Sequence, residues 1–183
     1  MRIVAGEWRG RTLAAPPGQA TRPTADRVRQ TLFDMLLHAP WGGRARIEGA
    51  RVLDAFAGTG ALGLEALSRG AAEAAFIERD RAALATLRAN VAACRAEQRC
   101  RVLAGDATAP PPGVACQLLF LDPPYAQGLA GAALAALAAR GWIAPGALLA
   151  VETGRSETVT EMFGEPLASR VLGAARISVF RAA

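Results

Sequence analysis

The chain has 183 residues, of which 52% are hydrophobic and 20% are charged, a balance typical of a globular protein with a full core. No apolar run is long enough to span a bilayer, and the start has no signal-peptide pattern, so we expect a cytoplasmic protein without a membrane partner. The net charge of +5 comes from 21 arginines, without a single lysine, against 16 acidic residues.

Residues that commonly bind metals are scarce. The three cysteines, Cys94, Cys100 and Cys116, form no C-x-x-C pair, and the one histidine, His38, lies in an apolar stretch. An odd number of cysteines without metal-ligand spacing is typical of reduced thiols in a cytoplasm. We therefore expect neither a metal site nor histidine-based catalysis.

Residues 1–40 are expected to form an N-terminal extension. Residues 2–14 suggest a short hairpin with its turn at 7–10, and a proline-rich link over 15–23 follows. Thr24 is expected to cap a helix that runs to about residue 38.

From residue 50 onward, predicted strands and helices alternate. The expected strands are 51–56, 74–78, 101–104, 117–121 and 147–151, the expected helices are 61–69, 80–97 and 129–139, and 169–181 is expected to be a strand pair. This alternation predicts an α/β fold with a doubly wound, mostly parallel sheet and helices on both faces. We interpret 1–183 as one domain, with the extension 1–40 preceding a Rossmann-like core over 50–183.

The extension is strongly basic. Residues 1–30 carry six arginines against two acidic residues. A basic segment before an enzyme-like core predicts a polyanionic partner, because the planar guanidinium group suits phosphate. The candidate contacts are Arg9, Arg11, Arg22 and Arg27. A solvated charged face is the alternative.

A glycine-rich turn, DAFAGTG at 54–60, follows the first core strand. Gly58 and Gly60 allow the backbone to approach a ligand closely. Glu78 ends the next strand, where a carboxylate can accept hydrogen bonds from ribose hydroxyls, and Asp106 follows the third strand. With Gly63 the turn matches G-x-G-x-x-G, a pattern that several nucleotide-like cofactors share, so these residues fit NAD as well as S-adenosylmethionine.

The sequence DPPY at 122–125 separates these two cofactors. It follows a predicted buried strand, at the sheet edge where α/β proteins bind ligands. Asp122 and the Pro123 carbonyl can accept both N–H bonds of a conjugated amine and so favour the pyramidal form with an available lone pair. Tyr125 offers a flat face for stacking a base. Hydride transfer has no evident use for this motif, whereas methyl transfer to nitrogen does.

These residues together give the chain a specific likeness. It resembles the class I S-adenosylmethionine-dependent methyltransferases that modify exocyclic amines, and among them the bacterial 16S rRNA guanine-N2 methyltransferases of the RsmD type. The likeness spans nearly the whole chain, and its motifs are VAG at 4–6, WRGR at 8–11, RPTADRVR at 22–29, DAFAGTG at 54–60, LGLEALSRG at 62–70, ERD at 78–80 and DPPY at 122–125.

The resemblance implies a seven-stranded sheet, S-adenosylmethionine as the methyl donor, and a guanine N2 amine of 16S rRNA as the acceptor. That RNA would be presented by the small ribosomal subunit or an assembly intermediate, and we expect a monomer. The implied catalytic residues are Asp122, Pro123 and Tyr125, and the implied donor-binding residues are Thr24, Asp54, Gly58, Gly60, Glu78, Asp106 and Ala107.

Three other acidic or hydroxyl side chains receive structural interpretations. Glu65 and Ser68 are expected to cap or pack their helix. Glu152, at another strand end, could face the cleft, but a surface acid is the favoured interpretation.

Other functions stay open at this point. The same chemistry on adenine N6 or on another exocyclic amine of DNA or RNA is the nearest alternative. Enzymes acting on protein glutamine usually have asparagine at the position of Asp122, which disfavours them. An NAD-dependent oxidoreductase would need a catalytic residue that the isolated His38 does not supply. A non-catalytic RNA-binding module is the remaining alternative, disfavoured by intact donor and acceptor motifs.

Overall fold

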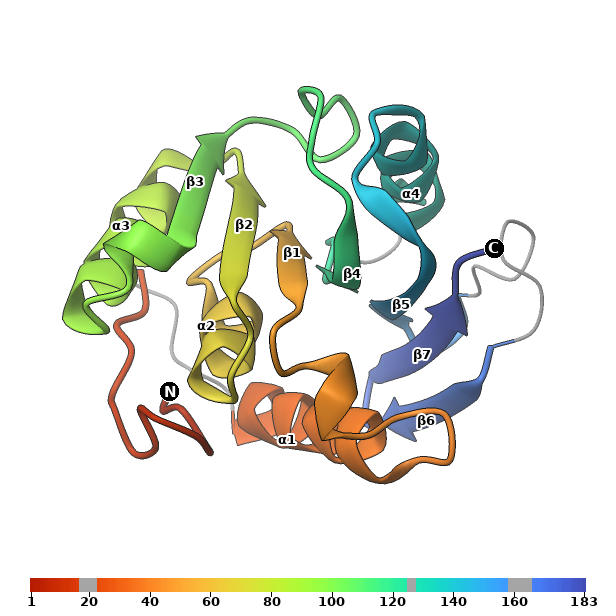
Figure 1. Ribbon diagram of the computed structural model, residues 1–183, viewed down its shortest axis with the longest axis horizontal. Helices are drawn as coiled ribbons and strands as arrows, with labels where there is room; N and C mark the ends of the chain where they lie inside the picture. The colour runs from red at the N-terminus through yellow and green to blue at the C-terminus, as the bar shows by residue number, and fades with distance from the viewer. Residues whose placement is uncertain (17–22, 125–127, 158–165) are drawn as a thin grey trace.

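The computed structural model describes residues 1–16, 23–124, 128–157 and 166–183, with the backbone alone for residues 23–25. Seven strands form one sheet in the order β3-β2-β1-β4-β5-β7-β6 (Figure 1). Their bounds are β1 Arg51–Ala55, β2 Glu73–Glu78, β3 Cys100–Ala104, β4 Cys116–Leu121, β5 Ile143–Gly154, β6 Ala168–Leu172 and β7 Ala175–Arg181.

The sheet is mostly parallel, as predicted. Strands β1 to β5 run parallel, whereas β7 is antiparallel to both β5 and β6. The strand order reverses between β1 and β4, and a crevice at such a switch point is where open α/β sheets bind ligands. The central strands are nearly continuous apolar runs because both faces of a parallel sheet are covered.

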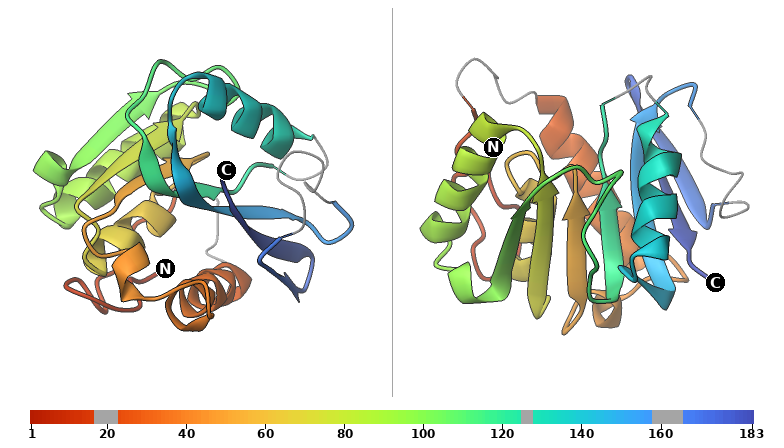
Figure 2. Two further views of the ribbon diagram at one scale, coloured as in Figure 1. Left: turned by 45° about the vertical axis from the view of Figure 1, so that its right-hand side comes forward. Right: turned by 90° about the horizontal axis from the view of Figure 1, so that it is seen from above.

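Four α-helices and two short 3-10 helices complete the described fold. Their bounds are α1 Pro23–His38, η1 Arg44–Arg46, α2 Ala61–Ser68, α3 Arg81–Ala93, η2 Glu97–Arg99 and α4 Leu129–Ala139. Buried side chains of α1, α2 and α3 pack on one face of the sheet, and those of α4 pack on the other. Figure 2 shows α1 and α4 on opposite sides of the sheet.

The N-terminal hairpin is present in minimal form. A single antiparallel bridge joins Arg2 and Thr12, and the backbone N–H groups of Ile3 and Gly10 donate to Arg11 and Ile3 at 3.0 and 2.8 Å. Ile3, Trp8 and Leu13 are buried in the same apolar cluster as α1 and α2. The hairpin is therefore packed on the core.

Three predicted boundaries are wrong. Helix α1 begins at Pro23, whose fixed φ and missing N–H suit a first helical position, so Thr24 lies inside the first turn instead of capping it. Helix α3 ends at Ala93, before Arg95 adopts a positive φ of 53°. Strand β5 is longer than the predicted 147–151, because it follows β4 across a register shift and then pairs with β7.

Among the residues described, no helix combines the length and the apolar character needed to cross a membrane.

Candidate functional site

A cavity of about 560 Å³ lies beyond the carboxyl ends of β1 to β4, at the strand-order reversal. Its size falls within the usual range for small-ligand sites. Its walls come from the ends of four strands, and the lining residues are Phe56, Ile77, Glu78, Arg79, Gly105, Asp106, Ala107, Asp122, Pro123 and Pro124. The topology thus gathers predicted donor and acceptor residues that lie far apart in the sequence.

The glycine-rich turn leads from β1 into α2. Gly58 and Gly60 have φ of 54° and 76°, a left-handed conformation that glycine adopts at little cost, and Gly60 is the N-cap residue of α2. A Cβ at Gly63 would lie 2.4 Å from the Phe76 ring, so this glycine lets α2 approach the sheet. The three glycines of the G-x-G-x-x-G match thus serve the turn and the helix packing.

Glu78 holds the turn from the end of β2. Its Oε2 accepts from the Gly58 N–H at 2.8 Å, and its Oε1 accepts from the Arg79 and Asp80 N–H groups at 2.8 and 2.7 Å. A carboxylate has about four acceptor positions, so about one remains for a ligand hydroxyl in this arrangement. Glu78 lines the cavity, and its predicted contact with a ribose stays a prediction. The sequence did not predict its hydrogen bonds to the turn.

Asp54 corrects a sequence expectation. Its side chain is only 1% exposed, and its Oδ2 accepts from the Gly63 N–H at 2.9 Å, inside the first turn of α2. Burial raises the pKa of Asp54 well above its usual value, against the lowering effect of that hydrogen bond. Asp54 therefore fastens β1 to α2 beneath the cavity and does not open onto it, contrary to the expected contact with the donor.

Asp106, another residue that lines the cavity, is held in place by its neighbours. Its Oδ1 accepts from the backbone N–H and the hydroxyl of Thr108 at 2.8 and 2.7 Å, and its Oδ2 lies 3.3 Å from Arg79 Nη1. The hydrogen bonds from Thr108, with the nearby Arg79 guanidinium, lower the pKa of Asp106. Asp106 is therefore an ionised acceptor beside Ala107 at neutral pH.

Asp122 follows β4 directly, and its carboxyl group is accessible from the cavity. Desolvation, together with the negative charge of Glu152, raises the pKa of Asp122 to about 7. The neighbouring Pro123 is buried and also lines the cavity.

Glu152 corrects a second expectation. Leu121 pairs with Val151 in the parallel β4–β5 register, so Asp122 and Glu152 are the next residues on two adjacent strands. Glu152 is half-buried and close enough to raise the pKa of Asp122, so it is not an isolated surface acid. The sequence alone could not show that Asp122 and Glu152 occupy equivalent positions on β4 and β5, because the pairing register is known only from the folded sheet.

Several lining residues escaped sequence reasoning. Phe56 has a φ of 64°, an unusual value for a bulky residue and one often seen at functional sites. Arg79, Ile77 and Gly105 line the same cavity. The only available signal was adjacency, because each of the four lies within three residues of a position that was predicted.

The predicted RNA-contacting arginines spread over two elements. Arg9 and Arg11 are exposed on the hairpin, although Arg11 Nη1 also donates to the Ala93 carbonyl at the end of α3. Arg27 is exposed on α1. Arg22 and Tyr125 lie outside the described residues, as does the side chain of Thr24.

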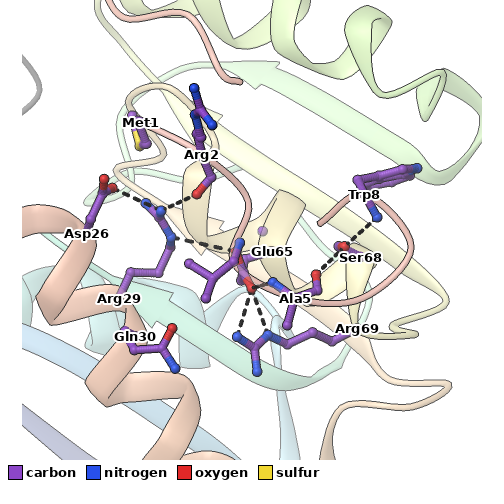
Figure 3. A network of polar contacts seen from close by, with 12 residues as sticks. Met1, Arg2, Ala5, Trp8, Asp26, Arg29, Gln30, Glu65, Ser68 and Arg69 are labelled. Atoms are coloured by element: carbon purple, nitrogen blue, oxygen red, sulfur yellow. Dashed lines mark hydrogen bonds and ion pairs between the residues drawn. The ribbon is translucent and has the colours of Figure 1, made fainter. Parts of the chain in front are cut away.

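Glu65 and Ser68 pack the hairpin against α2, in keeping with their structural interpretation. The buried Glu65 carboxylate accepts from the Val4 and Ala5 N–H groups at 2.8 and 3.0 Å and pairs with Arg69 at 2.8 Å (Figure 3). Ser68 Oγ accepts from the Trp8 N–H at 2.9 Å and donates to the Ala5 carbonyl at 2.6 Å.

Comparisons with known proteins agree with this fold. The family model "Conserved hypothetical protein 95" matches residues 1–180. Ribosomal RNA small subunit methyltransferase D of Escherichia coli is 44% identical over 155 residues, which cover 84% of this chain and 74% of that protein. The solved structure of the putative methyltransferase yhhF from Escherichia coli has a TM-score of 0.83 and 39% identity, and covers 100% of this chain and 97% of its own.

A more distant structure shares the fold. The 16S rRNA N2 G1207 methyltransferase RsmC of Thermus thermophilus, solved with AdoMet (S-adenosylmethionine) and guanosine, has a TM-score of 0.70 and 20% identity. The match covers 91% of this chain and 45% of that protein.

The strand order and the cavity at its reversal define a class I, Rossmann-like methyltransferase fold. Within that class, the chain belongs to the family of ribosomal RNA small subunit methyltransferase D.

Proposed function

We propose that this protein transfers the methyl group of S-adenosylmethionine to the N2 amine of a guanine in 16S rRNA. The observation that carries the proposal is that Asp122 and Pro123 line the same cavity as the acidic residues Glu78 and Asp106. The residues proposed to bind the acceptor amine and those proposed to bind the donor nucleoside thus lie in one cavity. Membership of the methyltransferase D family supports a small-subunit rRNA as the acceptor.

The donor side fits a nucleoside that carries an amino acid. We assign a ribose hydroxyl to Glu78, which keeps about one free acceptor position, and the adenine edge to Asp106 and Ala107. Gly58 leaves room for the methionine portion of the donor, because no atom lies within 4 Å of the position that a Cβ there would occupy. We assign Gly60 a backbone role beside the donor, since the space that its missing Cβ leaves is filled by Leu87. When bound, S-adenosylmethionine supplies an electrophilic methyl group on sulfur.

The acceptor side activates a weak nucleophile. We assign one N–H of the guanine amine to the Asp122 carboxylate and the other to the Pro123 carbonyl. Accepting both bonds favours the pyramidal nitrogen, whose lone pair then forms the N–CH₃ bond as the S–CH₃ bond breaks and its electron pair goes to sulfur. The methylated amine is acidic, so its proton leaves to Asp122 or water.

The target base must leave its helix to reach Asp122. Flipping a base costs a few kcal/mol, least for an unpaired one. We assign its stacking platform to Tyr125, and base–aromatic stacking returns about 1–3 kcal/mol. The remaining acceleration comes from aligning nitrogen, methyl carbon and sulfur.

We further propose that the protein acts in the cytoplasm as a monomer, on the small subunit or an assembly intermediate. Arg9, Arg11, Arg22 and Arg27 are the proposed RNA contacts. The exposed positions of Arg9, Arg11 and Arg27 support this assignment, because guanidinium groups on a surface are available to phosphates.

Methyl transfer tests the proposal. The protein is incubated with methyl-labelled S-adenosylmethionine and either unmodified small subunits or free 16S rRNA. We expect label in at least one RNA, and the better substrate identifies the form that the enzyme recognises. A protein that binds S-adenosylhomocysteine in calorimetry but labels neither RNA would retain the donor site and lose the proposed acceptor.

A further inference from the structure

Asn90 is a buried amide on α3, 2% exposed, whose hydrogen bonds reach two separate segments. Its Oδ1 accepts from the Ala14 N–H at 2.8 Å, and its Nδ2 donates to the Ala14 carbonyl at 3.1 Å and to the Thr59 carbonyl at 3.0 Å. Ala14 lies at the end of the N-terminal hairpin, and Thr59 is the central residue of the glycine-rich turn. One side chain therefore joins the basic extension to the turn beside the cavity.

The turn rests on the same helix face. A Cβ at Gly60 would lie 2.3 Å from Leu87 Cδ1, and Leu87 precedes Asn90 by three residues, so the two side chains are neighbours on α3. Thr59 also meets the other end of the hairpin, because its Oγ1 lies 3.9 Å from Met1 Sδ. The turn is thus held between α3 and both ends of residues 1–14.

Contacts that do not involve Asn90 also hold the hairpin in place. Glu65 and Ser68 of α2 bind its backbone, and Arg29 of α1 donates to the Arg2 carbonyl at 2.6 Å (Figure 3). Helix α2 starts directly after Gly60. A displacement of the turn can therefore reach the hairpin through α2, through the weak Thr59–Met1 contact and through Asn90, whose side-chain amide hydrogen-bonds to both segments.

We propose that Asn90 is a positioning residue that couples donor binding to RNA binding, by tying the donor turn to the hairpin that carries Arg9 and Arg11. The inference rests on the proposed function. A donor that orders the turn stabilises, through Asn90, the hairpin geometry that binds RNA. The coupling is reciprocal, so RNA strengthens donor binding by the same factor.

The test uses unmodified small subunits or in vitro transcribed 16S rRNA, whichever is the better methylation substrate, and measures the affinity for it with and without saturating S-adenosylhomocysteine. For the wild type we expect about a fivefold or greater increase in RNA affinity with the ligand, at the lower end of typical couplings. In N90A the factor should fall toward one. T86A is the control on the same helix, because the Thr86 hydroxyl donates to the Ala82 carbonyl within α3, and this variant should keep the wild-type factor.

Thermal melting shows which variants are less stable. A variant that is less stable but still folded in the assay keeps the wild-type coupling factor, because that factor compares two affinities of the same folded protein. Hydrogen exchange on the wild type provides a test that needs no variant. S-adenosylhomocysteine should slow exchange of the Ala14 amide and of residues 2–14 as well as of the turn. A folded N90A with the wild-type factor, or protection confined to residues 58–60, would overturn the inference.

A wild type that methylates RNA yet shows a coupling factor of one would refute the coupling while leaving the proposed function intact. A wild type that binds S-adenosylhomocysteine but neither binds nor methylates RNA would refute the proposed function itself.

Discussion

The ionisation of Asp122 sets the chemistry available in the cavity. A carboxylate accepts hydrogen bonds at both oxygens, whereas its protonated form donates one and accepts less well. Desolvation and the adjacent Glu152 charge raise the pKa of Asp122 from 3.8 to about 7. The group therefore gains its active, ionised form as the pH rises through neutrality.

The pH profile should show this group. We expect kcat/KM to fall as the pH drops below about 7, because protonated Asp122 no longer accepts the amine proton. E152Q removes one of the two effects that raise this pKa, so its acidic limb should move to lower pH. Stopped-time methylation assays across pH 5 to 9 measure both profiles. An E152Q limb at the wild-type position would show that Glu152 does not act on Asp122.

Substitutions at Asp122 and Glu78 should separate acceptor from donor binding. D122A removes a charged hydrogen bond of about 1.5–3 kcal/mol, so kcat should fall about 10- to 100-fold with donor affinity little changed. E78A should instead weaken S-adenosylhomocysteine binding about tenfold or more, because it removes a ligand acceptor and releases the Gly58 N–H.

Calorimetry and steady-state kinetics provide the two readouts, and D122N and E78Q serve as matched variants of similar volume. Equal loss of donor affinity in D122A and E78A would contradict the separate assignments.

The N-terminal hairpin combines a structural and a proposed binding role. Its apolar residues complete the core beside α1 and α2, while Arg9 and Arg11 remain on the surface. Arg99 joins it to η2, with Nη1 3.2 Å from Glu7 Oε2 and the guanidinium 5.3 Å from the Trp8 ring centre. The basic side chains are therefore presented from a fixed platform.

Replacing Arg9 and Arg11 with glutamine should weaken RNA binding and reduce its salt dependence. Each lost phosphate contact lowers the slope of log affinity against log salt by about 0.7–0.9. Filter binding from 50 to 300 mM salt measures the slope. The double variant R81Q/R88Q controls for the change in net charge, because Arg81 and Arg88 are also exposed but lie on α3. If both double variants gave the wild-type slope, the hairpin would not contact RNA phosphates.

Glu65 should determine how firmly the hairpin stays in place. E65A leaves the buried Arg69 side chain without its anion, removes one of the two carboxylates beside Arg29, and frees two hairpin N–H groups. Loss of one partner of a buried ion pair costs about 3–5 kcal/mol, which corresponds to a fall in Tm of roughly 10 °C for a chain of this size. Scanning calorimetry measures the fall, and R44A, which breaks an exposed pair with Glu48, should change Tm little. An unchanged Tm in E65A would contradict the structural role.

Sequence patterns predicted most of the fold because its elements are local. Several signals act within a few residues of the chain: the apolar runs of β1, β4 and β5, the Asp80 cap of α3, and the glycines that end helices. The patterns missed the true length of β5, which depends on pairing with β7 far along the chain. Helix ends were less well predicted, since a positive φ at Arg95 has no sequence signal as strong as glycine.

The candidate site was predicted where motifs fall at strand ends. Glu78 ends β2, Asp106 and Asp122 come after β3 and β4, and the parallel topology brings all three to one cavity. Asp54 was misplaced, because a motif does not reveal which side of a turn an acid faces. Asn90 was missed altogether, since its partners lie 76 and 31 residues away.

Across the whole molecule, the hairpin, α1 and the sheet share one apolar cluster, and polar links from Glu65 and Asn90 cross between them. We propose that residues 1–183 fold as one domain, with the extension 1–40 melting together with the core. The donor cavity and the basic surface then belong to one cooperative unit, as the proposed coupling requires.

The identity of the methylated nucleoside tests the central claim most directly. Unmodified small subunits are incubated with the protein and labelled S-adenosylmethionine, and their 16S rRNA is digested to nucleosides and separated. We predict that the label appears in N2-methylguanosine with the wild type and falls about 10- to 100-fold with D122A. Label in N6-methyladenosine or another nucleoside, in place of N2-methylguanosine, would contradict the proposed acceptor.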